Sequence, residues 1–161
     1  MDSRTSKENY YLDIAEAVLE RSTCLRRKYG ALIVKNDEIL ATGYNGAPRG
    51  RQNCSDLGHC TRSELKIPSG ERYELCRSVH AEANAIISAA RRDMMGGTLY
   101  LVGREAADGT LIPDATPCGM CKRLIINAGI SKVITRTGDR EFITTNVRDW
   151  VFNDESIGRC L

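Results

Sequence analysis

Two short segments, each at the start of a predicted helix, carry residue types that bind metal ions. The first is His80-Ala81-Glu82 and the second is Pro117-Cys118-Gly119-Met120-Cys121. One imidazole and two thiolates are good zinc ligands, and three protein ligands leave a fourth position open for water, which is the mark of a catalytic site. This pair of segments constrains the fold most, because one metal ion requires the starts of both helices to meet.

The spacing inside each segment suits this chemistry. Cys118 and Cys121 are three residues apart and therefore share one face of a helix. The free N–H groups at a helix N-terminus lower the pKa of nearby thiols, and Pro117 suits a helix start because no N–H is needed there. Glu82 can share a site with His80 only in the first turn of its helix, where it need not touch the metal.

His-x-Glu followed by Pro-Cys-x-x-Cys is the signature of zinc-dependent base deaminases. We predict that Glu82 is the proton shuttle of such a reaction. Zinc lowers the pKa of bound water towards about 7, and the zinc-bound hydroxide then attacks the amine-bearing carbon, C4 in cytosine. Glu82 passes the protons of that water to the ring nitrogen and to the leaving amine. The alternative is that Cys118 and Cys121 form a structural zinc clip or are core thiols, and the paired segments make it the weaker interpretation.

The composition indicates one globular domain over residues 1–161, with 42% hydrophobic and 27% charged residues. A net charge of +2 gives no large footprint for long nucleic acid, although a local site for a phosphate remains compatible with it. No apolar run reaches the ~20 residues that span a bilayer, and the polar start lacks a secretory stretch. We therefore expect a cytoplasmic protein with no membrane partner.

The hydrophobic pattern predicts an α/β fold with three main helices. Helical spacing favours residues 6–20, 79–92 and 118–128, and Gly129 ends the last of these. The predicted buried stripe of the second helix consists of Ala83, Ile86, Ile87 and Ala90. The predicted buried face of the third consists of Cys121, Leu124, Ile125 and Ala128.

Short apolar runs predict the strands. A β-hairpin is expected over residues 31–43 and further strands over 98–102 and 132–135, with a short strand and a helix after residue 141. The strand–helix–strand order over residues 98–135 implies parallel pairing with a right-handed crossover. Residues 51–77 show no regular hydrophobic periodicity, and so long a loop indicates either a function or a structural cross-link that holds it in place.

Four stretches resemble the deoxycytidylate (dCMP) deaminase family of the cytidine deaminase superfamily, namely residues 24–34, 43–50, 79–86 and 117–129. The zinc signature is common to all branches, so the motif Gly43-Tyr44-Asn45-Gly46-Ala47-Pro48 discriminates better. The likeness covers roughly residues 10–135, and the connections 51–76 and 104–116 match it less well. The connection over residues 103–116 is longer than in the simplest members.

The resemblance implies a three-layer α/β/α fold around a central five-stranded mixed sheet. It implies zinc ligands at His80, Cys118 and Cys121, with Glu82 as the proton shuttle. It also implies that Asn45 holds the sugar in a nucleotide pocket to which residues 43–50 contribute, and that the protein is a homo-oligomer, a hexamer or a dimer.

Basic residues next to these motifs are candidates for binding a substrate phosphate. Arginine suits this role because its planar fork binds two oxygens. Of the four residues Arg26, Arg27, Lys28 and Arg49, we predict Arg26 and Arg49 as phosphate ligands. The alternative is that these side chains are solvated surface charges.

The remaining cysteines predict a second, structural zinc. Seven cysteines in a chain without secretory features favour metal binding over disulfides, and four soft ligands form the usual structural zinc site. We predict Cys24, Cys54, Cys60 and Cys76 as its ligands, with His59 as a possible replacement for Cys60. The alternative is a set of reduced thiols without metal, and Cys160 is expected to have no role.

The sequence thus predicts hydrolytic deamination of dCMP to dUMP and ammonia, with Zn²⁺ as cofactor and a small nucleotide as substrate. Alternatives within the same chemistry are cytidine, deoxycytidine, guanine or adenosine in tRNA. A different class is a zinc-stapled nucleotide-binding module that has lost catalysis, but such a module has no need of a proton shuttle at Glu82.

Overall fold

A computed structural model describes residues 3–153, and Cys160 lies outside the described residues. Five strands form one sheet in the order β2-β1-β3-β4-β5. Only the neighbours β3 and β4 run parallel within it, so the predicted mixed sheet is confirmed. The strands are β1 (Arg27–Lys35), β2 (Glu38–Tyr44), β3 (Thr98–Glu105), β4 (Lys132–Gly138) and β5 (Glu141–Asn146).

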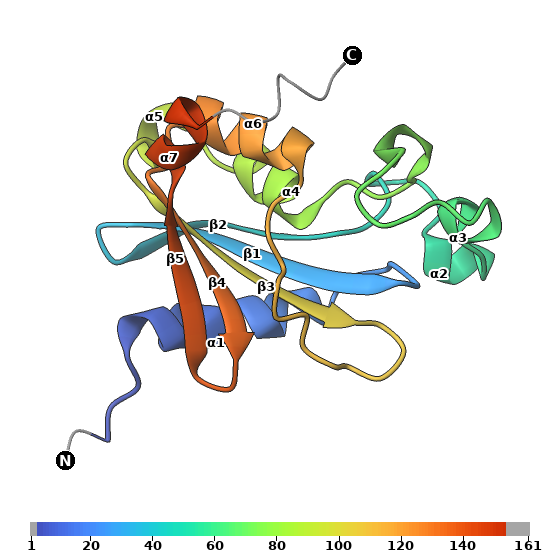
Figure 1. Ribbon diagram of the computed structural model, residues 1–161, viewed down its shortest axis with the longest axis horizontal. Helices are drawn as coiled ribbons and strands as arrows, with labels where there is room; N and C mark the ends of the chain where they lie inside the picture. Colours follow the sequence, from blue (N-terminus) through green and yellow to red (C-terminus); the bar gives the residue numbers. More distant parts are fainter. Residues whose placement is uncertain (1–2, 154–161) are drawn as a thin grey trace.

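Helices cover both faces of this sheet, which confirms the three-layer α/β/α fold (Figure 1). α1 (Lys7–Leu19) lies on one face, and four helices lie on the other. These four are α4 (Ala81–Ile87), α5 (Arg91–Met94), α6 (Gly119–Ala128) and α7 (Val147–Phe152). The long connection after β2 contains α2 (Cys54–Leu57), α3 (Thr61–Glu64) and the 3₁₀ turn η1 (Tyr73–Leu75).

Two hydrophobic cores lie on the two faces of the sheet, because successive strand residues point to opposite sides. In β1, Ala31 and Ile33 belong to the core beneath α4 and α6, whereas Leu32 and Val34 belong to the core beneath α1. The strand β3 repeats this alternation. Buried on both faces, these strands read as continuous apolar runs in the sequence.

The close approach of α4 to the sheet depends on Gly43 in β2. A Cβ atom at this position would collide with the carbonyl oxygen of Ala81 and the backbone nitrogen of Ala85. The absence of a side chain at Gly43 therefore lets the first turn of α4 lie directly on the strand, which fixes the height of His80 and Glu82 above the sheet.

The prediction for residues 79–92 was partly wrong. The helix α4 ends at Ile87, and α5 is a separate short helix. The buried residues of α4 are Ala81, Glu82 and Ala85. Of the predicted buried stripe, Ile87 is 68% exposed and Ala90 is also exposed. Helical spacing alone leaves the phase of a short helix open, and here the first turn faces inward because it carries a polar site.

The third helix follows its prediction more closely. Cys118 caps the N-terminus of α6 and Gly129 ends it in the left-handed conformation. Cys121, Ile125 and Ala128 are buried as predicted, but Leu124 is 44% exposed. The predicted apolar face was therefore wider than the contact with the sheet.

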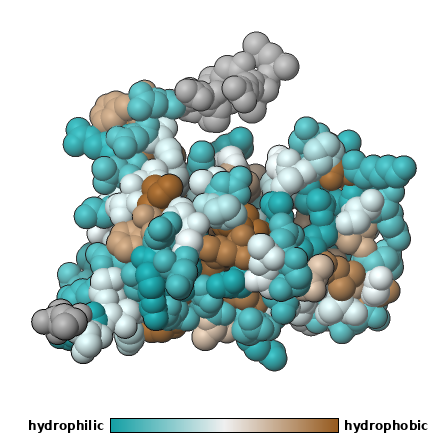
Figure 2. Space-filling view, turned by 60° about the horizontal axis from the view of Figure 1, so that its bottom comes forward, coloured by the Kyte–Doolittle hydropathy of each residue, from teal (hydrophilic) through white to brown (hydrophobic). Residues whose placement is uncertain are grey.

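The surface is mainly hydrophilic on the face shown in Figure 2, with apolar side chains in groups between polar ones. Within residues 3–153, no helix combines the length and the apolar character needed to cross a membrane.

Candidate metal centre and nucleotide cavity

Three side chains converge where two helices begin. His80 caps the N-terminus of α4, Cys118 caps that of α6, and Cys121 lies in the first turn of α6. Nδ1 of His80 lies 3.5 Å from Sγ of Cys118 and 3.5 Å from Sγ of Cys121. The predicted catalytic ligand set is thus brought together by the fold.

These distances fit a zinc ion. With Zn–N near 2.0–2.1 Å and Zn–S near 2.3 Å, a tetrahedral angle places the nitrogen and sulfur about 3.6 Å apart. The three ligand atoms lie within 4.8 Å of one another, and no other group among residues 3–153 meets that criterion. One imidazole and two sulfurs are also the right donor set.

The pKa values of the two thiols are shifted in opposite directions, because the thiols are hydrogen-bonded to each other. The hydrogen bond from Cys121 lowers the pKa of Cys118 to about 4, although burial opposes this. The same hydrogen bond, together with burial, raises the pKa of Cys121. A zinc ion at this point would favour the deprotonated form of both thiols, because zinc binds thiolates.

Glu82 lies beside this ligand set in the first turn of α4 and is 5% exposed. Burial raises its pKa above the usual range. Its carboxyl group also takes part in a hydrogen bond with Cys121. His80 and Glu82 thus share one site in the first turn of their helix, as the sequence required.

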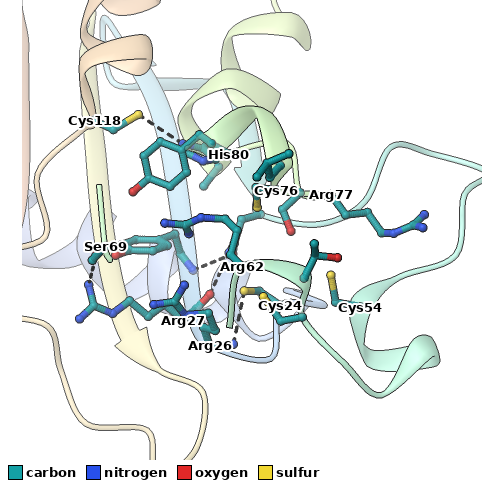
Figure 3. Close-up of a pocket in the computed structure, with 18 of the residues that line it drawn as sticks. Cys24, Arg26, Arg27, Cys54, Arg62, Ser69, Cys76, Arg77, His80 and Cys118 are labelled. Carbon is teal, nitrogen blue, oxygen red and sulfur yellow. Dashed lines mark hydrogen bonds between the residues drawn. The ribbon is translucent and has the colours of Figure 1, made fainter. Parts of the chain in front are cut away.

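A cavity of about 270 Å³ opens beside His80, Glu82 and Cys118. Figure 3 shows His80 and Cys118 on one side of the cavity and Cys24 and Cys54 on the other, with Cys76 drawn between them. Four arginines line it, whereas Glu82 is the only carboxylate among its described lining residues. The arginines are Arg26, Arg27, Arg62 and Arg77. A small anionic ligand suits this charge distribution.

The two predicted phosphate ligands lie in different places. Arg26 lines the cavity, and its Nη1 is a buried atom without a hydrogen-bond partner. Arg49 is exposed and is not among the residues that line the cavity. Arg27, in contrast, already interacts with Glu105 at 3.2 Å and with Ser69 at 3.4 Å.

Asn45 is buried in the cavity wall with its amide largely occupied by the protein. Its Oδ1 accepts hydrogen bonds from the backbone N–H of Tyr29 at 2.8 Å and from the hydroxyl of Ser22 at 2.6 Å. Its Nδ2 donates to the carbonyl of Arg27 at 2.8 Å. One N–H of the amide remains for a ligand.

The four cysteines of the predicted second zinc site line the same cavity. The backbone N–H of Arg26 donates to Sγ of Cys24 at 3.4 Å, and the pKa of Cys60 is lowered because backbone N–H groups outweigh its burial. Burial raises the pKa of Cys54, and the other three thiols add to this shift. The four sulfurs are not all within 4.8 Å of one another. His59 pairs with Glu64 at 3.2 Å.

Sequence reasoning missed several residues of the cavity wall, among them Tyr29, Arg62 and Tyr73. A signal existed for Tyr73, which is the only Phe, Trp or Tyr between Tyr44 and Tyr100. An aromatic residue in an otherwise polar loop between two cysteines is a candidate for packing against a site. No pattern distinguished Arg62 from neighbouring surface charges.

Comparison with known proteins agrees with this geometry. Residues 5–137 match the family described as the cytidine and deoxycytidylate deaminase zinc-binding region. A deoxycytidylate deaminase of Mycobacterium phage D29 is 40% identical over 82% of this chain and 95% of its own length. A deoxycytidylate deaminase of Schizosaccharomyces pombe is 33% identical over 83% of this chain, which spans only 38% of that relative.

Two solved structures show the same architecture. A dCMP deaminase from the cyanophage S-TIM5, in complex with dCMP and dUMP, is 27% identical with a TM-score of 0.57, covering 82% of this chain and 83% of that one. A cytidine deaminase from Burkholderia pseudomallei is 20% identical with a TM-score of 0.56, covering 89% and 95%. The second likeness concerns the fold alone.

Proposed function

Because the chain belongs to the cytidine and deoxycytidylate deaminase zinc-binding family, we propose that it is a zinc-dependent hydrolase that converts dCMP and water to dUMP and ammonia. The observation that carries this proposal is the arrangement of His80, Cys118 and Cys121 at zinc-binding distances with a buried carboxyl group beside them. The whole chain acts in this proposal as one deaminase domain.

The protein side chains divide the chemistry between them. Bound to His80, Cys118 and Cys121, Zn²⁺ supplies a Lewis acid that lowers the pKa of a water molecule. Glu82 accepts a proton from that water and delivers it to N3 of the pyrimidine. It then passes the second proton of the same water to the amine, which leaves from C4 as ammonia. Its burial supports this role, because burial favours the protonated form of the carboxyl group and raises its pKa.

The charge of the cavity supports a nucleotide rather than a nucleoside. We propose that Arg26 binds the 5′-phosphate, because its buried Nη1 has no partner in the protein and a charge-assisted hydrogen bond would satisfy it. Arg49 stays a proposed phosphate ligand with weaker support, since it is exposed and outside the cavity wall. The remaining amide N–H of Asn45 is proposed to contact the sugar. Relatives named as deoxycytidylate deaminases point to the same substrate.

The test is release of ammonia from equal concentrations of dCMP, CMP, deoxycytidine, cytidine and guanine. We expect strong turnover of dCMP alone. Glu82→Gln should lower kcat by roughly 10²–10⁴-fold while keeping its zinc, because Glu82 is not a ligand. Retained zinc is the control that separates a lost proton shuttle from a lost metal site.

Other outcomes distinguish the alternatives. Turnover of a different substrate in the panel would keep the mechanism and replace dCMP. Silence on all five substrates by zinc-loaded protein would contradict the proposal, and a tRNA adenosine or a silent nucleotide-binding module would then be tested. Full activity in Glu82→Gln would contradict the role of Glu82.

We also propose a second, structural zinc held by Cys24, Cys54, Cys60 and Cys76, with His59 as the alternative to Cys60. Support comes from their common cavity and from the N–H···S bond that the backbone of Arg26 donates to Cys24. The expected zinc content is two ions per chain, falling to one in Cys54→Ser. A content of one ion in the unaltered protein would contradict this second site.

A homo-oligomer, either a hexamer or a dimer, is our proposal for the assembly. Large apolar side chains are exposed on α4, α6 and α7, including Ile87, Leu124 and Phe152. Exposed apolar surface of this kind marks interaction sites. The six free cysteines among the described residues suit the reducing cytoplasm, where we propose that the enzyme works.

A further inference from the structure

Arg62 of α3 is a buried charge without a counter-ion. The residue is 6% exposed, and no carboxylate within residues 3–153 forms an ion pair with it. Its Nε is a buried atom without a hydrogen-bond partner. A buried charge is costly unless its contacts compensate for the lost hydration, so the contacts that Arg62 does make indicate why it is there.

Those contacts hold the outer loop of the long connection. Nη2 of Arg62 donates to the carbonyl of Pro68 at 2.8 Å and to the carbonyl of Glu71 at 2.9 Å. One nitrogen thus fixes two points of the loop that leads into η1. The guanidinium also lies over the ring of Tyr73, with Cζ 4.6 Å from the ring centroid, and such a cation–π contact gains strength when it is desolvated.

Tyr73 carries this contact to the metal centre. Its ring meets the imidazole of His80 edge-on, with centroids 4.7 Å apart and planes at 89°. Nδ1 of the same imidazole lies 3.5 Å from Sγ of Cys118 and 3.5 Å from Sγ of Cys121. The orientation of the ligand ring is therefore limited by Tyr73, whose own position is limited by Arg62. In the view of Figure 3, Arg62 is drawn between His80 and Cys24.

We infer that Arg62 is a positioning residue that holds Tyr73 against His80 and so couples the long connection to the catalytic zinc ligand. The inference rests on the proposed zinc centre. Mutation of a group that orients a metal-binding histidine typically lowers metal affinity or activity by roughly 10–100-fold. Cys60 and Cys76 flank the Arg62–Tyr73 pair in the sequence. The proposed structural zinc ion at those cysteines would therefore hold the same contact in place.

The primary test measures zinc release to a chromophoric chelator, with zinc-loaded full-length protein. The kinetic phase of zinc release that is absent from His80→Ala belongs to the catalytic ion. Arg62→Gln replaces the guanidinium with an amide that can still donate but carries no charge, and it should release this ion roughly 10–100-fold faster. Tyr73→Leu should do the same. Tyr73→Phe keeps the ring and loses only the hydroxyl that accepts from the N–H of Gly70, so it should stay close to the unaltered protein. Arg72→Gln is the matched control, since Arg72 is exposed and pairs with Glu74.

The double variant Arg62→Gln/Tyr73→Leu separates positioning from general destabilisation. Because Arg62 acts through Tyr73, the double variant should release zinc no faster than the faster single variant, whereas independent effects would multiply. Multiplying effects, or a release rate in Tyr73→Leu equal to that of the unaltered protein, would overturn the inference. The Tyr73→Phe and Tyr73→Leu pair keeps the test decisive if Arg62→Gln does not fold.

Kinetics with dCMP give the second readout. A misoriented ligand ring should lower kcat by about tenfold or more in Tyr73→Leu and leave KM nearly unchanged, because this variant keeps the four arginines of the cavity and the ring acts on the metal rather than on the nucleotide. A change in KM alone would overturn the assigned role. If the unaltered protein does not deaminate dCMP, the proposed function fails, while zinc release still decides the inference about Arg62.

Discussion

Asn45 illustrates how much of a candidate ligand-binding side chain can be occupied by the protein itself. Both acceptor positions of its Oδ1 are filled by Ser22 and Tyr29, and one N–H is bound to the carbonyl of Arg27. These bonds join the β2 end of the hairpin to the start of β1, from which Arg26, Arg27 and Tyr29 enter the cavity wall. Asn45 therefore shapes the pocket, whatever its last N–H binds.

Asn45→Asp tests this role. The carboxylate keeps the acceptors but replaces the donor to the carbonyl of Arg27 with a second negative oxygen. We expect the free energy of unfolding to fall by about 1–3 kcal/mol, because a buried acceptor loses its partner. Urea denaturation of the zinc-loaded protein is the measurement. Asn36→Asp, at an exposed turn where both residues are tolerated, is the control. An equal change in the free energy of unfolding of the two variants would show that the hydrogen bonds of Asn45 do not hold the pocket together.

The element that matters most for the site is α4, a helix of only seven residues. So short a helix has little stability of its own. Its position comes from packing of Ala81 and Ala85 against the sheet at Gly43. The proposed ligand His80, at the N-cap, and the proposed proton shuttle Glu82 are thus placed by a glycine on a different element.

Gly43→Ala should therefore disturb both stability and metal binding. The added methyl group has no space between β2 and α4, and overpacking of this kind costs about 1–3 kcal/mol. We expect a lower urea midpoint and faster loss of the catalytic zinc, because α4 must move away from the strand. Gly119→Ala meets open space and should be neutral or stabilising. Zinc retention at the level of the unaltered protein would refute the dependence of α4 on Gly43.

Across the whole molecule, a network of charges joins α1 to the sheet on the face opposite the metal centre. Arg136 of β4 is 6% exposed and pairs with Glu16 at 2.7 Å and with Asp13 at 2.8 Å. Arg104 shares Glu16, and Arg140 shares Asp13. Burial alone would raise the pKa of both carboxyl groups, but the arginines outweigh it and lower both pKa values.

Stability should consequently fall in acid. A carboxylate whose pKa is lower in the folded state stabilises the fold fully above its unfolded pKa, here the ordinary values 3.8 for Asp13 and 4.5 for Glu16. That contribution disappears as the pH falls through the lower folded pKa. Urea unfolding between pH 7 and pH 3 should therefore show a weaker pH dependence in Glu16→Gln than in the unaltered protein. Both proteins are compared at the same zinc concentration, so that protonation of the metal ligands affects them equally. Parallel curves of unfolding free energy against pH would contradict the prediction.

The proposed assembly is also a property of the whole molecule. Leu124→Glu places a charge among the exposed apolar side chains of α6 and α7, so we expect light scattering to show a smaller particle than the unaltered protein forms. Leu65→Glu is the matched control, because Leu65 is 58% exposed in the long connection. A monomeric mass for the unaltered protein would contradict the proposed oligomer. Equal particle masses for the two variants would show that the interface lies elsewhere on the molecule.

Local rules were enough for much of this protein. The apolar runs of β1 and β3, the cap and stop of α6 at Cys118 and Gly129, and the parallel β3–β4 crossover all follow from neighbours in the sequence, so the sequence predicted them. The types and spacing of His80, Cys118 and Cys121 within their two segments predicted the candidate ligand set that the fold brings together. Such features depend on interactions within a few residues or on topological rules that hold for most chains.

Only the tertiary structure decided the phase of α4, the exposure of Ile87, the engagement of Asn45 and the contact of Arg62 with Tyr73. Each depends on which distant surface a short segment meets. The burial of Glu82 against the usual preference of carboxylates is the clearest case, since its cause is a glycine on β2 and a cysteine on α6. Periodicity records the average preference of a segment for burial, whereas a site is built from the exceptions that distant contacts make stable.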